Sequence, residues 1–243
     1  MFFYMHTRRI RFFIHKLFRK PKNGFNHIIS LGYNCETAFR FLKYFRFEEA
    51  SLFNWAASET FDTLIHALEN LDKIGMDGFQ LYHGLWKCNN TKICWHGRQK
   101  MNVYLEHRDT ELVRQQDVAE LSARIQYLKQ KFIKIAQGED TKLFIYKLHT
   151  PQISNETANK ILKLHQVLTD VIQAKNFKLL IVHEQGVIHL PENSNYMVRT
   201  VKCFAPDAYV HSRQHMTNGW DKIFAEFYPT KIIKRNKTYK FDN

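Results

Sequence analysis

The stretch that decides the fold is "HIISLGYNCETAFRFL", residues 27–42. It opens with an apolar run of strand length at 27–31, turns at Gly32, and continues into a segment whose apolar residues have helical spacing. An apolar run that ends at a glycine and gives way to helical periodicity is typical of a strand-to-helix unit. The stretch therefore predicts a strand at 27–31, a sharp turn at Gly32 and a helix at 36–45.

The rest of the chain repeats this alternation. Apolar runs of strand length lie at 142–148, 177–183 and 196–204, and helical periodicity lies at 110–137, 154–174 and 219–227. A further helix is expected to begin at Ser58 as its N-cap and to end near Leu71. Strands that alternate with helices of this length imply right-handed crossovers. We therefore predict an α/β fold, with a mostly parallel sheet and helices on both faces in three layers.

One aromatic-rich segment, at about 79–107, departs from this alternation. Within it "WKCNNTKICW", residues 86–95, is typical of a hairpin with Asn89 and Asn90 in its turn. We expect the segment to be an irregular hairpin insertion in the α/β domain.

Charge is concentrated at the two ends of the chain. The 243 residues carry a formal charge of +13, of which residues 1–22 contribute +7 and residues 231–243 contribute +4. Residues 23–230 hold the remaining +2, whereas a nucleic-acid-binding domain would carry its basic face on the folded body. We therefore expect a basic arm at 1–22, a single α/β domain at 23–230 and a basic tail at 231–243, with no nucleic-acid partner.

The basic arm has the pattern of an amphipathic surface helix. Ile10, Phe13, Ile14 and Leu17 recur at helical spacing, and basic residues lie between them. Four cysteines in a chain of this length indicate a reducing compartment rather than a disulfide framework. We expect a cytoplasmic protein held at the inner membrane face by contact between the arm and anionic lipid. The alternative is that the arm packs on the domain with its basic residues in solvent.

The first strand-to-helix turn contains Asn34 and Cys35. In an α/β sheet, ligands bind outside the carboxyl ends of the strands, and unpaired N–H groups at a helix start favour negative charge. A thiol placed there ionises more readily, and its thiolate is a nucleophile, while Asn34 could donate a hydrogen bond to an oxyanion. The turn predicts a catalytic cysteine. The alternative is that Cys35 only fills a small buried pocket, as free cysteines often do.

The same region carries a family resemblance. "IISLGYNCETAFRFLKYFRFEEASLFNWAAS", residues 28–58, resembles the opening of a bacterial family of domains of unknown function that are assigned as papain-like cysteine peptidases. Members have a pattern similar to I-S-L-G-x-N-C-x-x-A, followed by a triplet similar to F-D-W. The triplet is Phe53-Asn54-Trp55 in this chain, so Asn54 stands where an aspartate is expected. The resemblance implies a hydrolase with Cys35 as nucleophile, and an asparagine at 54 could still orient an imidazole.

A cysteine nucleophile needs a base, which is most often histidine. The resemblance favours His107, before the long helical segment, whereas chain order favours His211 or His215, because they follow the last strand and precede the last helix. His183, at the end of an apolar run, is a fourth candidate. These alternatives stay open at the level of sequence.

Metal and cofactor signals are weak. His83, Cys88, Cys94 and His96 lie close together, but their spacing is not a usual zinc pattern, and no glycine-rich phosphate loop follows the first strand. We expect no metal and no cofactor, and two ordinary reduced cysteines at 88 and 94.

Together these features predict a cysteine-dependent hydrolase or acyl transferase that acts on a small-molecule, glycan or acyl substrate, in bacterial envelope or capsule polysaccharide assembly. There are two alternatives. One is a non-catalytic peripheral membrane protein. The other is a coenzyme-A-binding acyltransferase, because Gly32, Asn34 and Cys35 are also similar to the Gly-Asn-Cys start of certain capsule-biosynthesis proteins.

Overall fold

The centre of the molecule is a four-stranded parallel sheet. The computed structural model describes residues 23–32, 36–45, 51–54, 56–83, 85–95, 111–148, 154–184, 193–201 and 219–229. The strand order is β2-β7-β8-β9, with bounds His27–Ser30, Lys142–Lys147, Phe177–Glu184 and Tyr196–Val201, and each neighbouring pair is parallel. The predicted α/β class with a parallel sheet is confirmed.

A second parallel pairing lies next to β2. Strand β1 (Asn23–Phe25) precedes β2 with one residue between them and pairs with β10 (Phe227–Pro229). Because β9 is the strand farthest from β2, the chain returns across the sheet before it forms β10. The last described helix therefore lies near the first strand-to-helix turn.

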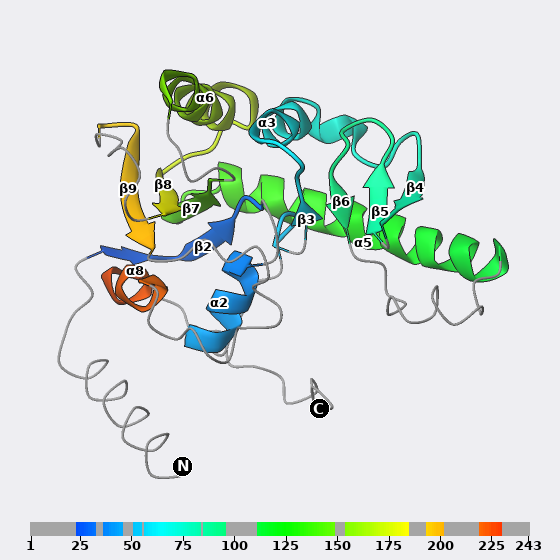
Figure 1. Ribbon diagram of the computed structural model, residues 1–243, viewed down its shortest axis with the longest axis horizontal. Coiled ribbons are helices and arrows are strands. Elements are labelled where there is room, and N and C mark those ends of the chain that lie inside the picture. The colour runs from blue at the N-terminus through cyan, green and yellow to red at the C-terminus, as the bar shows by residue number, and fades with distance from the viewer. Residues whose placement is uncertain are drawn as a thin grey trace, which may run out of the picture.

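Helices pack against the parallel sheet. Their bounds are α2 Glu36–Phe45, α3 Phe61–Glu69, α5 Glu111–Gln137, α6 Asn155–Gln166 and α8 Trp220–Glu226, with a 3₁₀ turn η1 at Leu71–Lys73 and a π-helical turn η2 at Val167–Val171. Figure 1 shows α3 and α6 on one side of the sheet and α2 and α8 on the other.

Strand alternation explains why both groups of helices bind the sheet. Leu143 and Ile145 of β7 belong to a buried cluster with side chains from α2 and α8. Phe144 and Tyr146, which point to the opposite face, belong to a larger cluster with side chains from α3, α5 and α6. The apolar residues at 143–146 of β7 thus follow from burial of the strand on both faces.

Helix starts follow their capping residues. Ser154 caps α6 as predicted, with its hydroxyl accepting from the Thr157 N–H in a reciprocal capping box. The prediction of Ser58 as the cap of α3 is wrong. Thr60 is the cap, and its hydroxyl oxygen accepts from the N–H of Thr63 at 3.1 Å.

Beside the parallel sheet lies a second, antiparallel sheet that the sequence did not predict as such. Its order is β3-β6-β5-β4, with bounds Ala56–Ala57, Cys94–Trp95, Leu85–Cys88 and Phe79–Tyr82. The indole N–H of Trp86 donates to the buried carboxylate of Asp117 on α5, and the Gln126 amide of the same helix donates to the Ile74 carbonyl at 3.4 Å. Phe132 of α5 also packs against Phe144 of β7, with ring centroids 6.1 Å apart, so α5 contacts both sheets (Figure 1).

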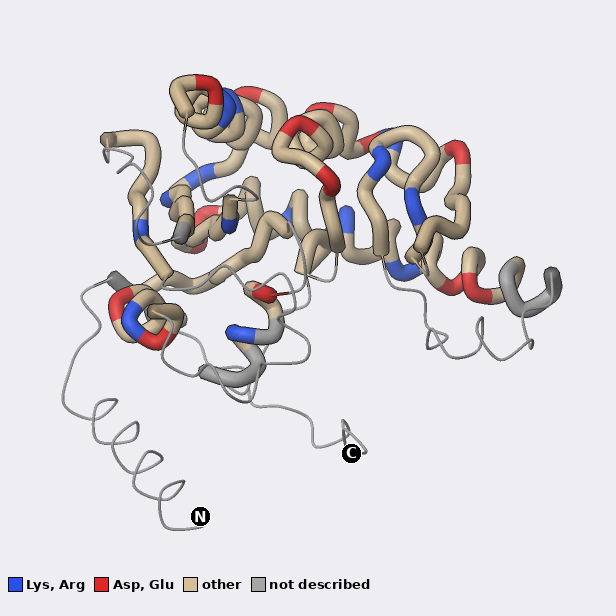
Figure 2. Tube along the Cα trace, viewed as in Figure 1, with Lys and Arg blue, Asp and Glu red and all other residues tan. Residues whose placement is uncertain are grey.

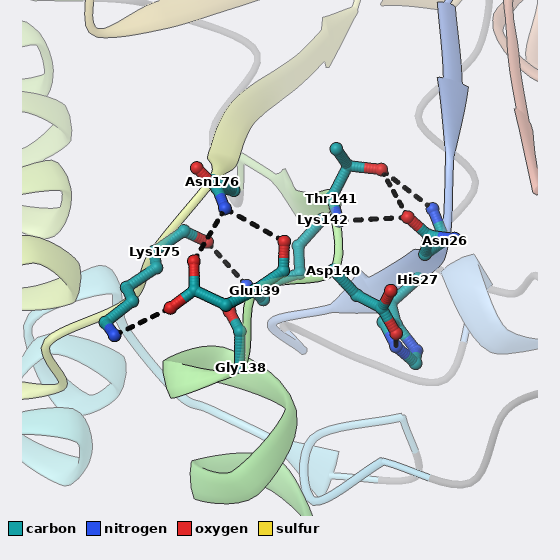
Figure 3. A network of polar contacts seen from close by, with 9 residues as sticks. All are labelled: Asn26, His27, Gly138, Glu139, Asp140, Thr141, Lys142, Lys175 and Asn176. Atoms are coloured by element: carbon teal, nitrogen blue, oxygen red, sulfur yellow. Dashed lines mark hydrogen bonds and ion pairs between the residues drawn. The ribbon is translucent and has the colours of Figure 1, made fainter.

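The amino ends of the parallel strands are joined by short polar contacts (Figure 3). Asn26, before β2, accepts from both the N–H and the hydroxyl of Thr141, before β7, at 3.0 and 2.8 Å. Lys175 and Asn176, before β8, donate to the carboxylate of Glu139 at 2.8 and 3.2 Å. The hydrogen bond and charge of Lys175 hold the pKa of Glu139 below its ordinary value.

Charges of both signs are interspersed along the described chain (Figure 2). The basic arm at 1–22 and the basic tail at 231–243 lie outside the described residues. Within the described ranges, no helix combines the length and the apolar character that crossing a bilayer requires.

Candidate functional site

The predicted strand-to-helix turn lies at the carboxyl edge of the parallel sheet. Strand β2 ends at Ser30, whose hydroxyl accepts from the N–H of Gly32 at 3.2 Å. Gly32 has φ +91°, and a Cβ added there would lie 3.6 Å from the Phe53 carbonyl oxygen. Residues that carry a side chain rarely adopt that φ, so glycine allows the chain to turn here. Helix α2 then begins at Glu36. The predicted strand, turn and helix are confirmed.

Asn34 and Cys35 lie outside the described residues. The described residues on either side of them, Gly32 and Glu36, are both buried at the carboxyl edge of the sheet. The fold thus positions the two ends of the turn.

Around the start of α2 lies a buried polar cluster, which we call the Glu36 cluster: Glu36, Arg40, Lys147 and Trp220. Lys147, the last residue of β7, donates from Nζ to Glu36 Oε2. The Trp220 indole N–H, at the start of α8, donates to Glu36 Oε1 at 3.0 Å, and an Arg40 guanidinium nitrogen lies 3.7 Å from the same oxygen. Glu36 and Lys147 are each 1% exposed, and Arg40 is 7% exposed.

The Glu36 cluster contains one carboxylate and two cationic groups, so its formal charge is +1. Charges this deeply buried interact more strongly than surface ion pairs, because water screens them less. The N-terminal end of α2 adds a partial positive charge of its own. Lys147, Arg40 and the start of α2 thus stabilise negative charge at this end of the helix, where the Glu36 carboxylate lies.

Asn54 lies near the same turn. It is 1% exposed, and its N–H donates to the Ser51 carbonyl at 3.3 Å. Its neighbour Phe53 contributes the backbone oxygen closest to the position of a Cβ on Gly32. The structure therefore brings Phe53, the first residue of the predicted triplet, next to Gly32, whereas Trp55 lies outside the described residues.

Among the four histidine candidates, His183 is described. It is buried near the carboxyl end of β8, where it pairs with Thr200 of β9. Because side chains alternate along a strand, His183 points to the same face as Ile181, the face covered by α3, α5 and α6. Lys147 points to the same face as Ile145, the face covered by α2 and α8. His183 and the Glu36 cluster thus lie on opposite faces of the sheet.

His107, His211 and His215 lie outside the described residues. The segment that carries the last two leaves β9 at Val201 and rejoins the described chain at Gly219. A Cβ added at Gly219 would lie 3.0 Å from the Thr200 carbonyl oxygen and 3.2 Å from Val201 Cα. The two ends of this segment are therefore in contact at the carboxyl edge, next to Trp220.

Cys88 and Cys94 are both free and buried in the antiparallel sheet. Burial acts to raise the pKa of Cys88, but hydrogen bonds from Thr91, Gly75 and Asn90 hold that pKa below its ordinary value. Burial raises the pKa of Cys94. Within the described ranges no three His, Cys, Asp or Glu side chains gather as metal ligands, and His96 lies outside those ranges.

The sequence predicted the turn but not the residues that support it. Glu36 directly follows Cys35, yet its partners Lys147 and Trp220 are 111 and 184 residues away along the chain. One signal was present: Lys147 interrupts the apolar run "KLFIYKL", and a lysine in a buried strand needs a polar partner.

Fold and site together define an α/β protein with a buried charged cluster at the carboxyl edge of its parallel sheet. Comparisons with protein-family models, with curated proteins and with solved structures gave no match to this chain.

Proposed function

We propose that this protein is a cysteine-dependent hydrolase or acyl transferase with Cys35 as its nucleophile. The observation that supports this most is the Glu36 cluster, because it lies directly after Cys35 at the edge of the sheet where α/β proteins bind ligands. Positive charge beside a thiol, here from Lys147, Arg40 and the N-terminal end of α2, favours its ionised form, whereas burial opposes ionisation. The resemblance of residues 28–58 to papain-like cysteine peptidases supports the same chemistry.

In the proposed reaction, the Cys35 thiolate attacks an acyl or amide carbonyl carbon, forming a C–S bond while the carbonyl oxygen becomes an oxyanion. Asn34 and backbone N–H groups at the start of α2 donate hydrogen bonds to that oxyanion. The bond to the leaving group then breaks, and a protonated histidine supplies the proton to the leaving group. Water or another acceptor next attacks the thioester, gives its proton to the same histidine and releases Cys35.

For the base we prefer His211 or His215 to His107. The segment that carries them starts and ends at the carboxyl edge, at Val201 and Gly219. His107 instead lies four residues before Glu111, so it can reach at most ~14 Å from the start of α5.

The start of α5 is distant from the turn. Phe132 of α5 packs edge-on against Phe53, beside Gly32, with ring centroids 5.5 Å apart. Glu111 lies ~32 Å from Phe132 along the helix axis, at the usual rise per residue. Asn54 is our proposed partner for the imidazole of the base, because its neighbour Phe53 lies next to Gly32.

The test uses the full chain and needs no substrate. Each cysteine is alkylated with iodoacetamide across pH, and the modified peptides are quantified by mass spectrometry. We expect Cys35 to react with an apparent pKa well below the ~8.5 of a free thiol, and we expect Cys35→Ala to keep the fold. A Cys35 that titrates like a free thiol, or that does not react at all, would contradict the proposal.

We also propose that the basic arm at 1–22 attaches the protein to the cytoplasmic face of the inner membrane. A charge of +7 with interspersed apolar residues supports binding to anionic lipid. The full chain should co-sediment with vesicles containing phosphatidylserine and much less with phosphatidylcholine alone. A full-length variant with Arg8, Arg9 and Arg11 changed to Gln should lose most of this binding, and unchanged binding would contradict the proposal.

Attachment there would suit envelope or capsule polysaccharide assembly, with an acyl or glycan substrate. A rise in melting temperature with acyl-coenzyme A would favour the coenzyme-A-dependent form of the reaction.

We further propose that the fold is a three-layer arrangement in which the segment at about 79–107 is an insertion.

A further inference from the structure

We infer that the Glu36 carboxylate is a positioning group, which fixes the start of α2 to the end of β7 and to the start of α8. The inference rests on the proposed function, since the start of α2 directly follows the nucleophile Cys35. Glu36 itself does not touch the reacting atoms in this account; it acts through the turn that it holds.

The geometry shows how one carboxylate joins three elements. Oxygen Oε2 accepts from Lys147 of β7, and Oε1 accepts from the Trp220 indole of α8 at 3.0 Å. Arg40, one helical turn along α2, lies on the same side of the carboxylate at 3.7 Å from Oε1. Because both oxygens are engaged from different elements, the carboxylate has one orientation in which all these contacts form.

Packing alone does not require a charge at this position. Helices α2 and α8 already contact each other through Phe41 and Phe224, whose ring centroids are 5.2 Å apart. Burying an ion pair is costly, and apolar residues of similar size often stabilise a fold equally well. The polar contacts of Glu36 add a fixed orientation. Packed apolar rings can shift relative to each other, whereas a carboxylate that is bound on both oxygens holds the start of α2 in one position relative to β7 and α8.

The other end of α8 has its own tie. Arg199 of β9 donates from Nε to Glu226 Oε2 at 2.7 Å, at the last residue of α8. The two ends of α8 are therefore held by different partners, Glu36 at its start and Arg199 at its end. Gly219, directly before α8, lies against Thr200 of β9. The start of α8 is therefore next to both ends of the segment that carries His211 and His215. One carboxylate thus positions both the turn with the nucleophile and one end of the segment with the proposed base.

The experiment compares four variants of the full chain with the wild type. Lys147→Met and Trp220→Phe each remove one contact of Glu36 while keeping side-chain bulk. Lys142→Met is the matched control for the first, because Lys142 is a buried lysine at the opposite end of the same strand. Glu226→Gln is the matched control for the second, because it loosens the other end of α8.

Two readouts are measured: the alkylation rate of Cys35 across pH, and hydrogen exchange of peptides covering 36–45 and 220–226. Lys147→Met removes one of the two cationic groups beside Glu36, so the Cys35 rate, compared at a pH below the wild-type pKa, should fall about tenfold. Such a fall corresponds to a pKa about one unit higher. Trp220→Phe should lower the rate about threefold and speed exchange in both peptides. Lys142→Met and Glu226→Gln should stay within twofold of the wild-type rate.

Equal rates in Lys147→Met and Lys142→Met would overturn the inference. If Lys147→Met does not fold, Trp220→Phe decides: a rate equal to that of Glu226→Gln overturns the inference. A wild-type Cys35 that titrates like a free thiol overturns the proposed function instead. The positioning of α2 and α8 is then judged by hydrogen exchange alone, where no difference between variants and their controls overturns it.

Discussion

The two ends of strand β7 hold their lysines in different ways. Lys142, its first residue, is 0% exposed and donates to two backbone carbonyls, those of Gly138 at 2.6 Å and Lys175 at 2.5 Å (Figure 3). Lys147, its last residue, is equally buried but donates to the carboxylate of Glu36. Both are lysines of one strand, yet one has neutral partners and the other a charged partner.

The partners explain what each end does. The carbonyls around Lys142 belong to the loops that enter β7 and β8, so this lysine closes neighbouring connections. The carboxylate that binds Lys147 belongs to Glu36, the first residue of α2, and it also accepts a hydrogen bond from the Trp220 indole of α8. The contacts at the amino edge therefore join loops, whereas those of Glu36 at the carboxyl edge join β7, α2 and α8.

The largest expected difference between the two edges is in stability. Lys147→Met leaves a buried carboxylate with one cationic partner fewer and should cost about 3–5 kcal/mol of the free energy of unfolding. Lys142→Met removes a cation whose main partners are neutral carbonyls, and should cost on the order of 1–2 kcal/mol. Urea unfolding of both variants measures the difference. Equal losses in the free energy of unfolding would mean that the Glu36 carboxylate stabilises Lys147 no more than neutral carbonyl acceptors stabilise Lys142.

The next effect concerns a glycine at each edge. Gly219, at the carboxyl edge, has φ +105° and no room for a Cβ beside Thr200, so Gly219→Ala should cost about 1–3 kcal/mol. Gly138, at the amino edge, has no positive φ, and an added Cβ would lie 3.2 Å from the Lys134 carbonyl oxygen and 3.6 Å from that of Ile135.

Gly138→Ala should therefore cost less than about 1 kcal/mol. Thermal unfolding of the two variants provides the measurement. The prediction is wrong if Gly138→Ala is the more damaging of the two, since that would place the tighter constraint at the amino edge.

The smallest effect is on the pH dependence of stability. Burial lowers the pKa of Lys142 from its ordinary value near 10.5. Between the lowered value and 10.5 the unfolded chain binds more protons than the folded one, so this lysine makes stability rise with pH in that window. Lys142→Met should lack this rise. The check is the difference in unfolding free energy between wild type and variant from pH 8 to pH 10; a difference that stays flat would contradict the direction of the shift.

Much of the parallel sheet could be predicted because its signals are local. The apolar residues within 142–148 indicate a strand that is buried on both faces, and the structure shows β7 buried at each position. The Ser154 cap bonds within the first turn of its own helix, so it too can be recognised from neighbouring residues. The antiparallel sheet could not be predicted in the same way. Its strands are two to four residues long, too short to show alternation, and β3 and β6 pair across a long separation in the chain.

The candidate site shows the same division. Gly32 and the helix start at Glu36 follow from neighbouring residues, so the turn was predictable. The partners of Glu36 are not, because "KLFIYKL" contains two lysines that both need buried partners and nothing local says which one meets an acid. Only the register of β2 beside β7 brings Lys147 rather than Lys142 to the start of α2.

The most direct measurement is the pH profile of iodoacetamide alkylation at Cys35 in the unmodified chain, with Cys88 and Cys94 followed in the same digest. We predict that Cys35 reacts first and with an apparent pKa well below ~8.5, while the two buried thiols react slowly. A Cys35 that reacts no faster than Cys88 and Cys94, or only once the pH exceeds ~8.5, would contradict it.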